Sequence, residues 1–95
     1  MMFKNAKDFI ATTDLLEKLT IIDTTLRSCG AYIDSHDGVS FGFKYGDEYT
    51  VSCTWEDQYD HPEKSNCWRI YVRDSNGKPI GEDYLDVDVE EGRIL

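Results

Sequence analysis

Residues 39–55 read VSFGFKYGDEYTVSCTW, and apolar and polar side chains alternate along both halves of this stretch. The apolar positions are Val39, Phe41, Phe43 and Tyr45, followed by Tyr49, Val51, Cys53 and Trp55. A period of two is typical of half-buried strands, and Gly46-Asp47 suits a two-residue hairpin turn. The stretch therefore predicts two antiparallel strands, at 39–45 and 48–55, that share one apolar face.

A further strand is predicted at residues 67–73, with Trp68, Ile70 and Val72 directed inward. Asn76-Gly77 is the strongest short hairpin signal in the chain and would turn it back through 78–81. Residues 56–66 are expected to form an exposed loop, because Pro62 and the density of charge oppose a buried strand. Upstream, we expect a short strand at 31–34 and a turn at 35–38.

The C-terminal segment alternates apolar and acidic side chains. Leu85, Val87 and Val89 alternate with Asp86, Asp88 and Glu90. This pattern fits an edge strand with an acidic outer face, and a short helix is the open alternative.

The N-terminal third has helical periodicity. Asn5 is expected to cap a short helix that buries Phe9 and Ile10, and Thr13 would cap a second helix that ends at Gly30. The apolar stripe of the second helix would consist of Leu15, Leu19, Ile22 and Leu26. Its polar face would carry Glu17, Lys18, Asp23, Thr24, Thr25 and Arg27. One longer kinked helix is the alternative to two separate ones.

These elements predict an α+β fold in which an N-terminal helix, or two short helices, packs on one face of a four- to six-stranded antiparallel meander sheet. The length of 95 residues predicts a single domain, 1–95. Hydrophobic and aromatic contents of 40% and 13% exclude a disordered acidic tail. No export signal is expected, and three cysteines without an even-numbered framework favour a reducing compartment, so we expect a cytoplasmic protein of the producing or infected host cell.

The charge balance bears on the partner. Nineteen acidic against ten basic residues give a net charge of -9, which repels nucleic acid and anionic membranes and attracts basic surfaces. We expect a basic partner protein, such as a nucleic-acid-binding enzyme or complex, with no direct contact to nucleic acid or membrane. A monomer or a homodimer would be compatible with the sequence.

Acidic residues define two candidate partner-binding groups. The first lies in the C-terminal segment and comprises Glu82, Asp83, Asp86, Asp88 and Glu90. Asp86, Asp88 and Glu90 would form a solvent-facing row on one side of a strand. The second lies in the long loop and comprises Asp57, Tyr59, Asp60 and Glu63. The alternative is that acids on an edge strand only prevent edge pairing and keep the protein soluble.

No motif points to catalysis or to a metal. The cysteines and histidines lack zinc-ligand spacing, and Cys53 and Cys67 fall on opposite strand phases, so we expect buried, inert thiols. Asp34, His36 and Asp37 fit an ordinary turn and form no complete catalytic set. We therefore expect neither enzymatic activity nor a cofactor nor a bound metal.

One basic and aromatic group remains. Arg69, Tyr71 and Arg73 would share the outer face of one strand, with Lys44 nearby. Such residues could form a small exposed patch, but pairing with acids on neighbouring strands is the favoured interpretation.

The resulting hypothesis is a non-enzymatic acidic binding protein that inhibits a nuclease or defence complex by occupying its basic nucleic-acid-binding surface. In size and charge, the chain resembles in general character the phage anti-CRISPR proteins, DNA mimics and toxin-immunity proteins, which share no common sequence signature. The alternative is a small structural or adaptor domain of a larger assembly, or a homo-oligomer, whose acidity serves solubility alone.

Overall fold

The computed structural model describes residues 3–28, 40–56 and 67–95. In order along the chain these form α1 (Ala6–Thr12), α2 (Leu15–Ser28), β1 (Ser40–Tyr45), β2 (Tyr49–Glu56), β3 (Cys67–Asp74), β4 (Leu85–Asp88) and β5 (Arg93–Ile94). The strand and turn expected at 31–38, the helix end at Gly30, position Val39 and the loop at 57–66 lie outside the described residues.

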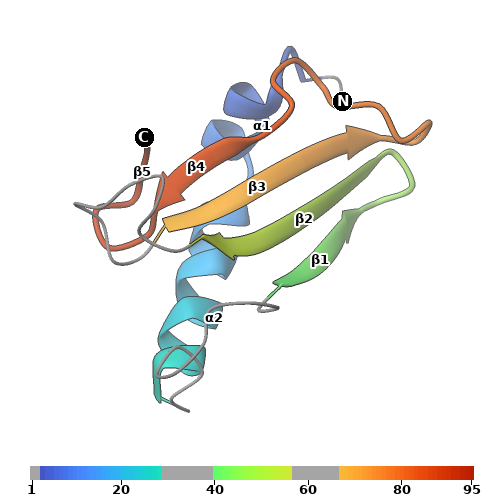
Figure 1. Cartoon of the computed structure of the whole chain (residues 1–95). Helices are drawn as coiled ribbons and strands as arrows, with labels where there is room; N and C mark the ends of the chain where they lie inside the picture. Colours follow the sequence, from blue (N-terminus) through green and yellow to red (C-terminus); the bar gives the residue numbers. More distant parts are fainter. Residues whose placement is uncertain (1–2, 29–39, 57–66) are drawn as a thin grey trace.

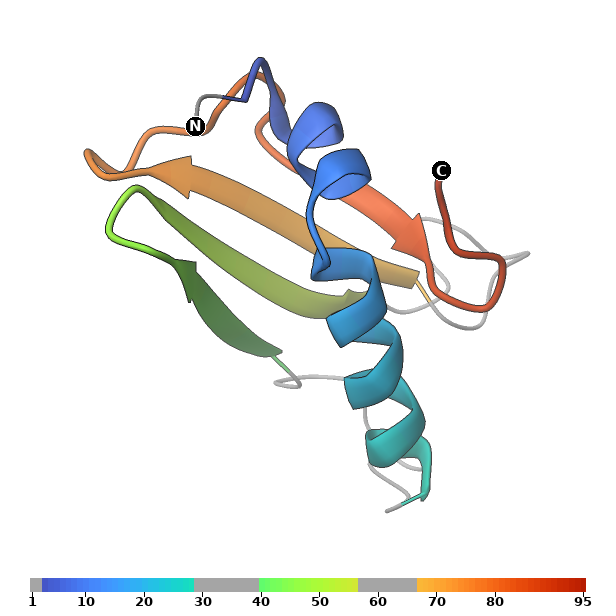
Figure 2. The ribbon, with the colours of Figure 1, turned by 180° about the vertical axis from the view of Figure 1, so that it is seen from behind.

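The described strands form one antiparallel sheet in the order β1-β2-β3-β4-β5, which is a meander. Both helices lie on the same face of this sheet, as Figures 1 and 2 show from opposite sides. The predicted α+β, two-layer arrangement is confirmed, with two helices and, among the described residues, five strands.

The two helices are separated at the threonine pair that the sequence singled out. The side chain of Asn5 accepts a hydrogen bond from the Asp8 backbone at 2.8 Å and caps α1, as expected. At the other end of α1, the Thr13 hydroxyl donates to the Phe9 carbonyl at 2.7 Å and accepts from the Leu15 N–H at 3.4 Å. Thr13 thus ends one helix and begins the next.

The core lies between the helices and the inward face of the sheet. Its buried members are Ala6, Phe9, Ile10, Leu15, Leu19, Val51, Cys53, Trp55, Trp68, Ile70, Val72, Val87 and Val89. The register places Trp68 opposite both Trp55 on β2 and Val87 on β4, so the inward residues predicted for these strands do share one face. The period of two identified them because successive side chains of a strand point to opposite sides.

Three local expectations differ from the structure. The β1–β2 turn contains three residues between the paired Tyr45 and Tyr49, one more than Gly46-Asp47 suggested. Asn76-Gly77 does turn the chain back along β3, as expected, and the N–H of Ile80 donates to the Val72 carbonyl at 3.1 Å. The returning segment forms only an isolated bridge, between Arg73 and Pro79, where a hairpin would have a second strand. No further strand is formed before Leu85, within the part of the chain that the structure describes.

The third difference concerns Asp23, which the helical pattern placed on the polar face of α2. It is only 4% exposed, whereas Ile21 on the same helix is 63% exposed. The reason is a specific partner, because Oδ1 of Asp23 accepts a hydrogen bond from the indole Nε1 of Trp68 at 2.9 Å. A buried polar group of this kind is tolerated where it is hydrogen-bonded.

Candidate functional site

The acidic C-terminal segment does not form the exposed row that its sequence suggested. Asp86 lies opposite Arg69 in the β3–β4 register, and the two side chains form a bidentate pair. Nε of Arg69 donates to Oδ1 at 2.9 Å and Nη2 donates to Oδ2 at 3.1 Å. The two side chains are only 16% and 10% exposed, so Asp86 is an internal partner of Arg69 and its carboxylate does not face solvent.

Asp88 is also buried, with only 4% of its surface exposed. Its Oδ1 accepts hydrogen bonds from the backbone N–H groups of Glu90 at 3.0 Å and Glu91 at 3.3 Å, at the start of the turn between β4 and β5. An aspartate that accepts from the residues after it stabilises a turn. The expected solvent-facing row of Asp86, Asp88 and Glu90 is therefore wrong, and so is the edge position of their strand, since β5 pairs with β4.

The remaining acids of this segment differ in exposure. Glu82 is half-buried and accepts a hydrogen bond from the Ala6 backbone at 3.2 Å, at the N-terminus of α1. Asp83 and Glu90 are exposed. Of the candidate acids that the structure describes, these two are open to a partner, and the loop candidates Asp57, Tyr59, Asp60 and Glu63 lie outside the described residues.

The face of the sheet opposite the helices carries a different feature. Arg69 and Tyr71 on β3 lie next to Tyr84, which directly precedes β4, and Arg73 follows two residues later on β3. The guanidinium of Arg69 lies over the Tyr84 ring at 4.0 Å from its centroid, and the rings of Tyr84 and Tyr71 are 5.9 Å apart. The Arg73 guanidinium lies 5.7 Å from the Tyr71 centroid. We call Arg69, Tyr84, Tyr71 and Arg73 the arginine–tyrosine row.

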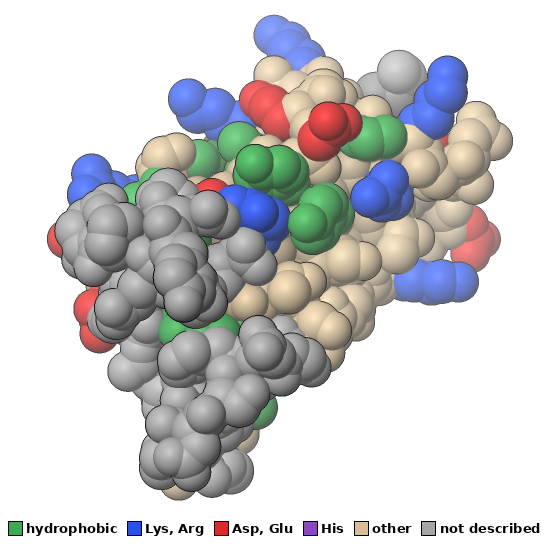
Figure 3. Space-filling model, viewed as in Figure 1, with side chains coloured by type: hydrophobic (Ala, Val, Ile, Leu, Met, Phe, Trp, Pro, Cys, Tyr) green, Lys and Arg blue, Asp and Glu red, His purple; other side chains and the backbone are tan. Residues whose placement is uncertain are grey.

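Figure 3 views this helix-free face, with hydrophobic and basic side chains side by side near its middle and a broad polar surface next to them. Outward positions of β2 on this face carry polar side chains, such as Thr50, Ser52 and Thr54, because they alternate with the buried Val51 and Cys53. Tyr84 is 43% exposed. The row thus presents aromatic and cationic groups beside polar side chains.

Sequence reasoning found part of this row. It placed Arg69, Tyr71 and Arg73 on one outer face and expected cross-strand pairing, which the Arg69–Asp86 pair confirms. It missed Tyr84, although the alternation of Leu85 and Asp86 indicates that Tyr84 points to the same side as Asp86. What was missing was the register, which opposes Arg69 to Asp86 and so brings Tyr84 beside Tyr71.

The described cysteines are buried, as expected, and Cys29 lies outside the described residues. Burial raises the pKa of the Cys53 thiol to about 12, which keeps it protonated and unreactive at neutral pH. Within residues 3–28, 40–56 and 67–95, no three His, Cys, Asp or Glu side chains are grouped so as to hold a metal ion. None of the described helices is long and apolar enough to cross a lipid bilayer.

Comparison of the chain with protein-family models, with curated proteins and with solved structures finds no match. The functional argument therefore rests on the chemistry of the surface itself.

Proposed function

We propose that this chain is a non-enzymatic protein-binding domain whose partner docks on the arginine–tyrosine row. The observation that carries the proposal is the arrangement of Tyr84 and Tyr71 between two guanidinium groups on the helix-free face of the sheet. Tyrosine and arginine are the residue types enriched at the energetic centres of protein interfaces.

The row is held in place before any partner arrives. Asp86 fixes Arg69 through two hydrogen bonds, and Arg69 in turn lies over the Tyr84 ring. Side chains that are already ordered lose little conformational entropy on binding, which favours affinity. The buried acid Asp86 therefore supports binding indirectly, as a positioning residue for the surface.

The net charge of -9 supports a basic partner. Long-range attraction accelerates the encounter of oppositely charged proteins, while aromatic contacts at the centre of an interface slow dissociation. Exposed Asp83 is adjacent in sequence to Tyr84 and would add a local acidic contact. The more specific form of this proposal is an inhibitor that covers the nucleic-acid-binding surface of a nuclease or defence complex.

A second candidate is an adaptor domain of a larger assembly. The specific observation that favours it is the mixed charge of the helix-free face, where Arg73 and the exposed Lys44 are cationic. A partner chosen by shape and aromatic contacts alone would bind with little dependence on salt, whereas steered binding to a basic protein weakens as ionic strength rises.

Both candidates can be tested by capture of partners from an extract of the native source at low and at high salt. The proposal expects a basic protein that is captured by the wild-type chain, lost with a Tyr71→Ala/Tyr84→Ala variant, and released by salt. Asp47→Lys, at an exposed position of the β1–β2 turn, is a control for altered net charge. Capture that survives the double tyrosine variant would contradict the proposed surface, and salt-resistant capture lost with that variant would favour the adaptor.

The same variants also test whether the partner is a negatively charged nucleic acid instead of a basic protein. If a single-stranded oligonucleotide binds the wild-type chain and the double tyrosine variant loses it, the aromatic and cationic row would be a nucleic-acid surface and the protein partner would be ruled out. The net charge argues against that result, because nucleic-acid binding gains its affinity from the neutralisation of phosphates by Lys and Arg.

A further inference from the structure

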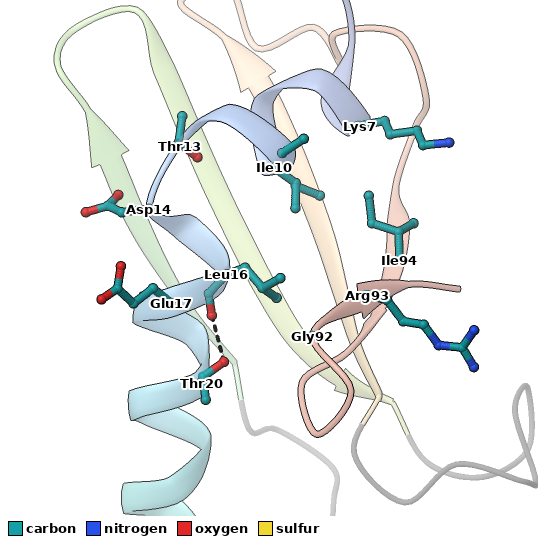
Figure 4. Close-up of a pocket in the computed structure, with 11 residues that line it drawn as sticks. Lys7, Ile10, Thr13, Asp14, Leu16, Glu17, Thr20, Gly92, Arg93 and Ile94 are labelled. Atoms are coloured by element: carbon teal, nitrogen blue, oxygen red, sulfur yellow. Dashed lines mark hydrogen bonds between the residues drawn. The ribbon is translucent and has the colours of Figure 1, made fainter.

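Two hollows in the surface differ in their chemistry. The larger, of about 720 Å³, lies where the α1–α2 junction faces β5, and Figure 4 shows apolar side chains of these elements meeting in its middle. The smaller, of about 330 Å³, lies at the end of the sheet where the β1–β2 turn and the turn after β3 lie side by side (Figures 1 and 2). We call it the turn pocket, and its lining includes Lys44, Asp47, Thr50, Arg73 and Asp74.

Two cationic side chains reach the turn pocket from strands that are not neighbours. The register pairs Lys44 of β1 with Thr50 of β2, and Thr50 with Arg73 of β3. All three side chains lie on the helix-free face, because they alternate with the inward side chains of their strands, such as the buried Val51 and Val72. Adjacent strands are about 4.8 Å apart, so the backbones at Lys44 and Arg73 are about 10 Å apart with Thr50 between them. Both long side chains can therefore contact one small ligand above Thr50.

The charges of Lys44 and Arg73 are not used by carboxylates in the described part of the chain. Neither residue forms an ion pair there, whereas Arg69 on the same face is held by Asp86. Arg73 donates one N–H group to the Gly77 carbonyl at 3.4 Å, which is a long hydrogen bond, and its other N–H groups remain. Both cations are thus available to an anion.

Two carboxylates also line the turn pocket, and the fold occupies one of them. Oδ1 of Asp74 accepts hydrogen bonds from the backbone N–H groups of Asn76 at 2.9 Å and Lys78 at 3.0 Å, inside the turn after β3. Asp47 is exposed in the β1–β2 turn and would repel an anion. The pocket therefore sets two available cations against one exposed carboxylate, although the chain as a whole carries a net charge of -9.

We propose that the turn pocket binds a doubly charged oxyanion of the phosphate class. The Arg73 guanidinium has the fork geometry that matches two phosphate oxygens, the Lys44 ammonium supplies a second positive charge, and the Thr50 hydroxyl is a neutral donor between them. The tetrahedral oxygens of a phosphate group point in several directions, so that donors from three strands can meet one ion. The site does not depend on the protein partner proposed above, because Lys44 and Thr50 are not part of the arginine–tyrosine row.

The affinity is expected to be low. The net charge of the chain and the carboxylate of Asp47 both oppose the approach of an anion. Lys44 and Thr50 are exposed, and contacts between charges are weak where water competes. We expect a dissociation constant on the order of 1–10 mM for the free ion.

Titration with inorganic phosphate, followed in ¹H–¹⁵N NMR spectra, tests the site. The expected result is a saturable change in the backbone signals of Lys44, Thr50 and Arg73 and in the Nε–H signal of Arg73. Sodium chloride at the same ionic strength is the control for general screening. Glycerol phosphate, titrated in the same way, distinguishes two sources of the group. Tighter binding of glycerol phosphate would assign the pocket to a phosphate monoester, and tighter binding of inorganic phosphate to the free ion.

Variants with a matched loss of charge locate the binding. Lys44→Gln and Arg73→Gln are each expected to weaken phosphate binding at least about threefold, because each removes one of the two cations. Lys7→Gln removes the same charge at an exposed position of α1 outside the pocket and should have a much smaller effect. Circular dichroism would establish that each variant is folded.

A change of the opposite sign gives an independent test. Asp47→Asn removes the exposed carboxylate of the pocket and is expected to tighten phosphate binding about twofold or more. Glu17→Gln changes the net charge equally at an exposed position of α2 outside the pocket, and it should tighten binding less.

Three results would overturn the proposal. The first is a response to phosphate no larger than the response to chloride. The second is phosphate binding that Lys44→Gln and Arg73→Gln leave unchanged, and the third is weaker binding by Asp47→Asn. None of these results decides whether a protein docks on the arginine–tyrosine row, because Tyr71 and Tyr84 are unchanged in every variant.

Discussion

Nε1 of Trp68 donates a hydrogen bond to Oδ1 of Asp23 at 2.9 Å, and this contact joins the middle strand of the sheet to α2. Trp68 is fully buried and Asp23 is 4% exposed, so the bond lies inside the molecule. It fixes how α2 sits on the sheet, and it explains why a charged residue occupies an inward position of the helix.

We expect Asp23→Ala to lower the free energy of unfolding by about 1–3 kcal/mol, because the buried indole N–H loses this acceptor. Asp23→Asn retains a side-chain oxygen and should lose clearly less. Urea unfolding followed by tryptophan fluorescence measures both variants. An Asp23→Ala protein as stable as the wild type would contradict a structural role for this bond.

The pair of Arg69 and Asp86 gives a second prediction. Asp86→Ala leaves a largely buried guanidinium without its bidentate acceptor, and we expect a loss of about 2–3 kcal/mol in the free energy of unfolding. Asp83→Ala, at an exposed acid of the same segment, should change it by no more than about 0.5 kcal/mol. The measurement is chemical unfolding of both variants. Equal losses would contradict the difference between Asp86, which Arg69 holds in the interior, and the exposed Asp83.

Gly81 lies close to Asn5, and Gly46 is a matched control for testing this contact. Both have positive φ angles, of 83° and 63°, but a Cβ at Gly81 would lie 2.5 Å from Cβ of Asn5, whereas nothing lies within 4 Å at Gly46. Gly46→Ala should cost about 1–2 kcal/mol for left-handed backbone alone. Gly81→Ala adds an overlap with the cap of α1 and should cost a further 1–3 kcal/mol, on the order of other overpacked sites.

Thermal unfolding of the two glycine variants gives the comparison directly. If Gly81→Ala is no more destabilising than Gly46→Ala, the segment at Gly81 does not pack against Asn5 as the structure shows.

The Cys53 thiol predicts a dependence of stability on pH. Burial raises its pKa from 9.0 to about 12, so in the folded protein it keeps a proton that the unfolded chain loses above pH 9. The contribution of the protonated Cys53 thiol to the free energy of unfolding is fully present below pH 9. It is lost as pH rises from 9 toward 12, at a slope of at most about 1.4 kcal/mol per pH unit. Cys53→Val lacks the titrating group and should show a shallower decline.

The check is the free energy of unfolding of wild type and Cys53→Val between pH 8 and about 10.5. All remaining titratable groups are the same in both proteins, so the difference between the two curves isolates the effect of Cys53. Parallel curves would mean that the thiol ionises equally readily in the folded and unfolded states.

Local patterns carried most of the fold prediction. The cap at Asn5, the break at Thr13 and the inward set on β2 and β3 follow from hydrogen bonds to near neighbours and from the pleat of a strand. These features depend on residues close in sequence, so the sequence contains their causes. The helix-free side of the sheet was partly predictable for the same reason, since Arg69, Tyr71 and Arg73 share one strand.

The candidate site was predicted less well because exposure of a charged side chain depends on distant partners. Asp86 and Asp88 alternate with apolar residues in the same way, yet one is held by Arg69 and the other by the turn that follows it. Asp23 fits a solvent-facing position of a helix until Trp68 is placed opposite it. Neither register nor helix orientation is encoded in the pattern of a single element.

The sequence by itself determined the net charge, the ends of the helices that local caps define, and which side chains of each strand point the same way. The tertiary structure alone decided which acids remain on the surface and that Tyr84 joins Tyr71 between two arginines. The physical reason is that backbone periodicity is a short-range property, whereas the desolvation and pairing of a charge depend on groups that only folding brings within a few ångströms.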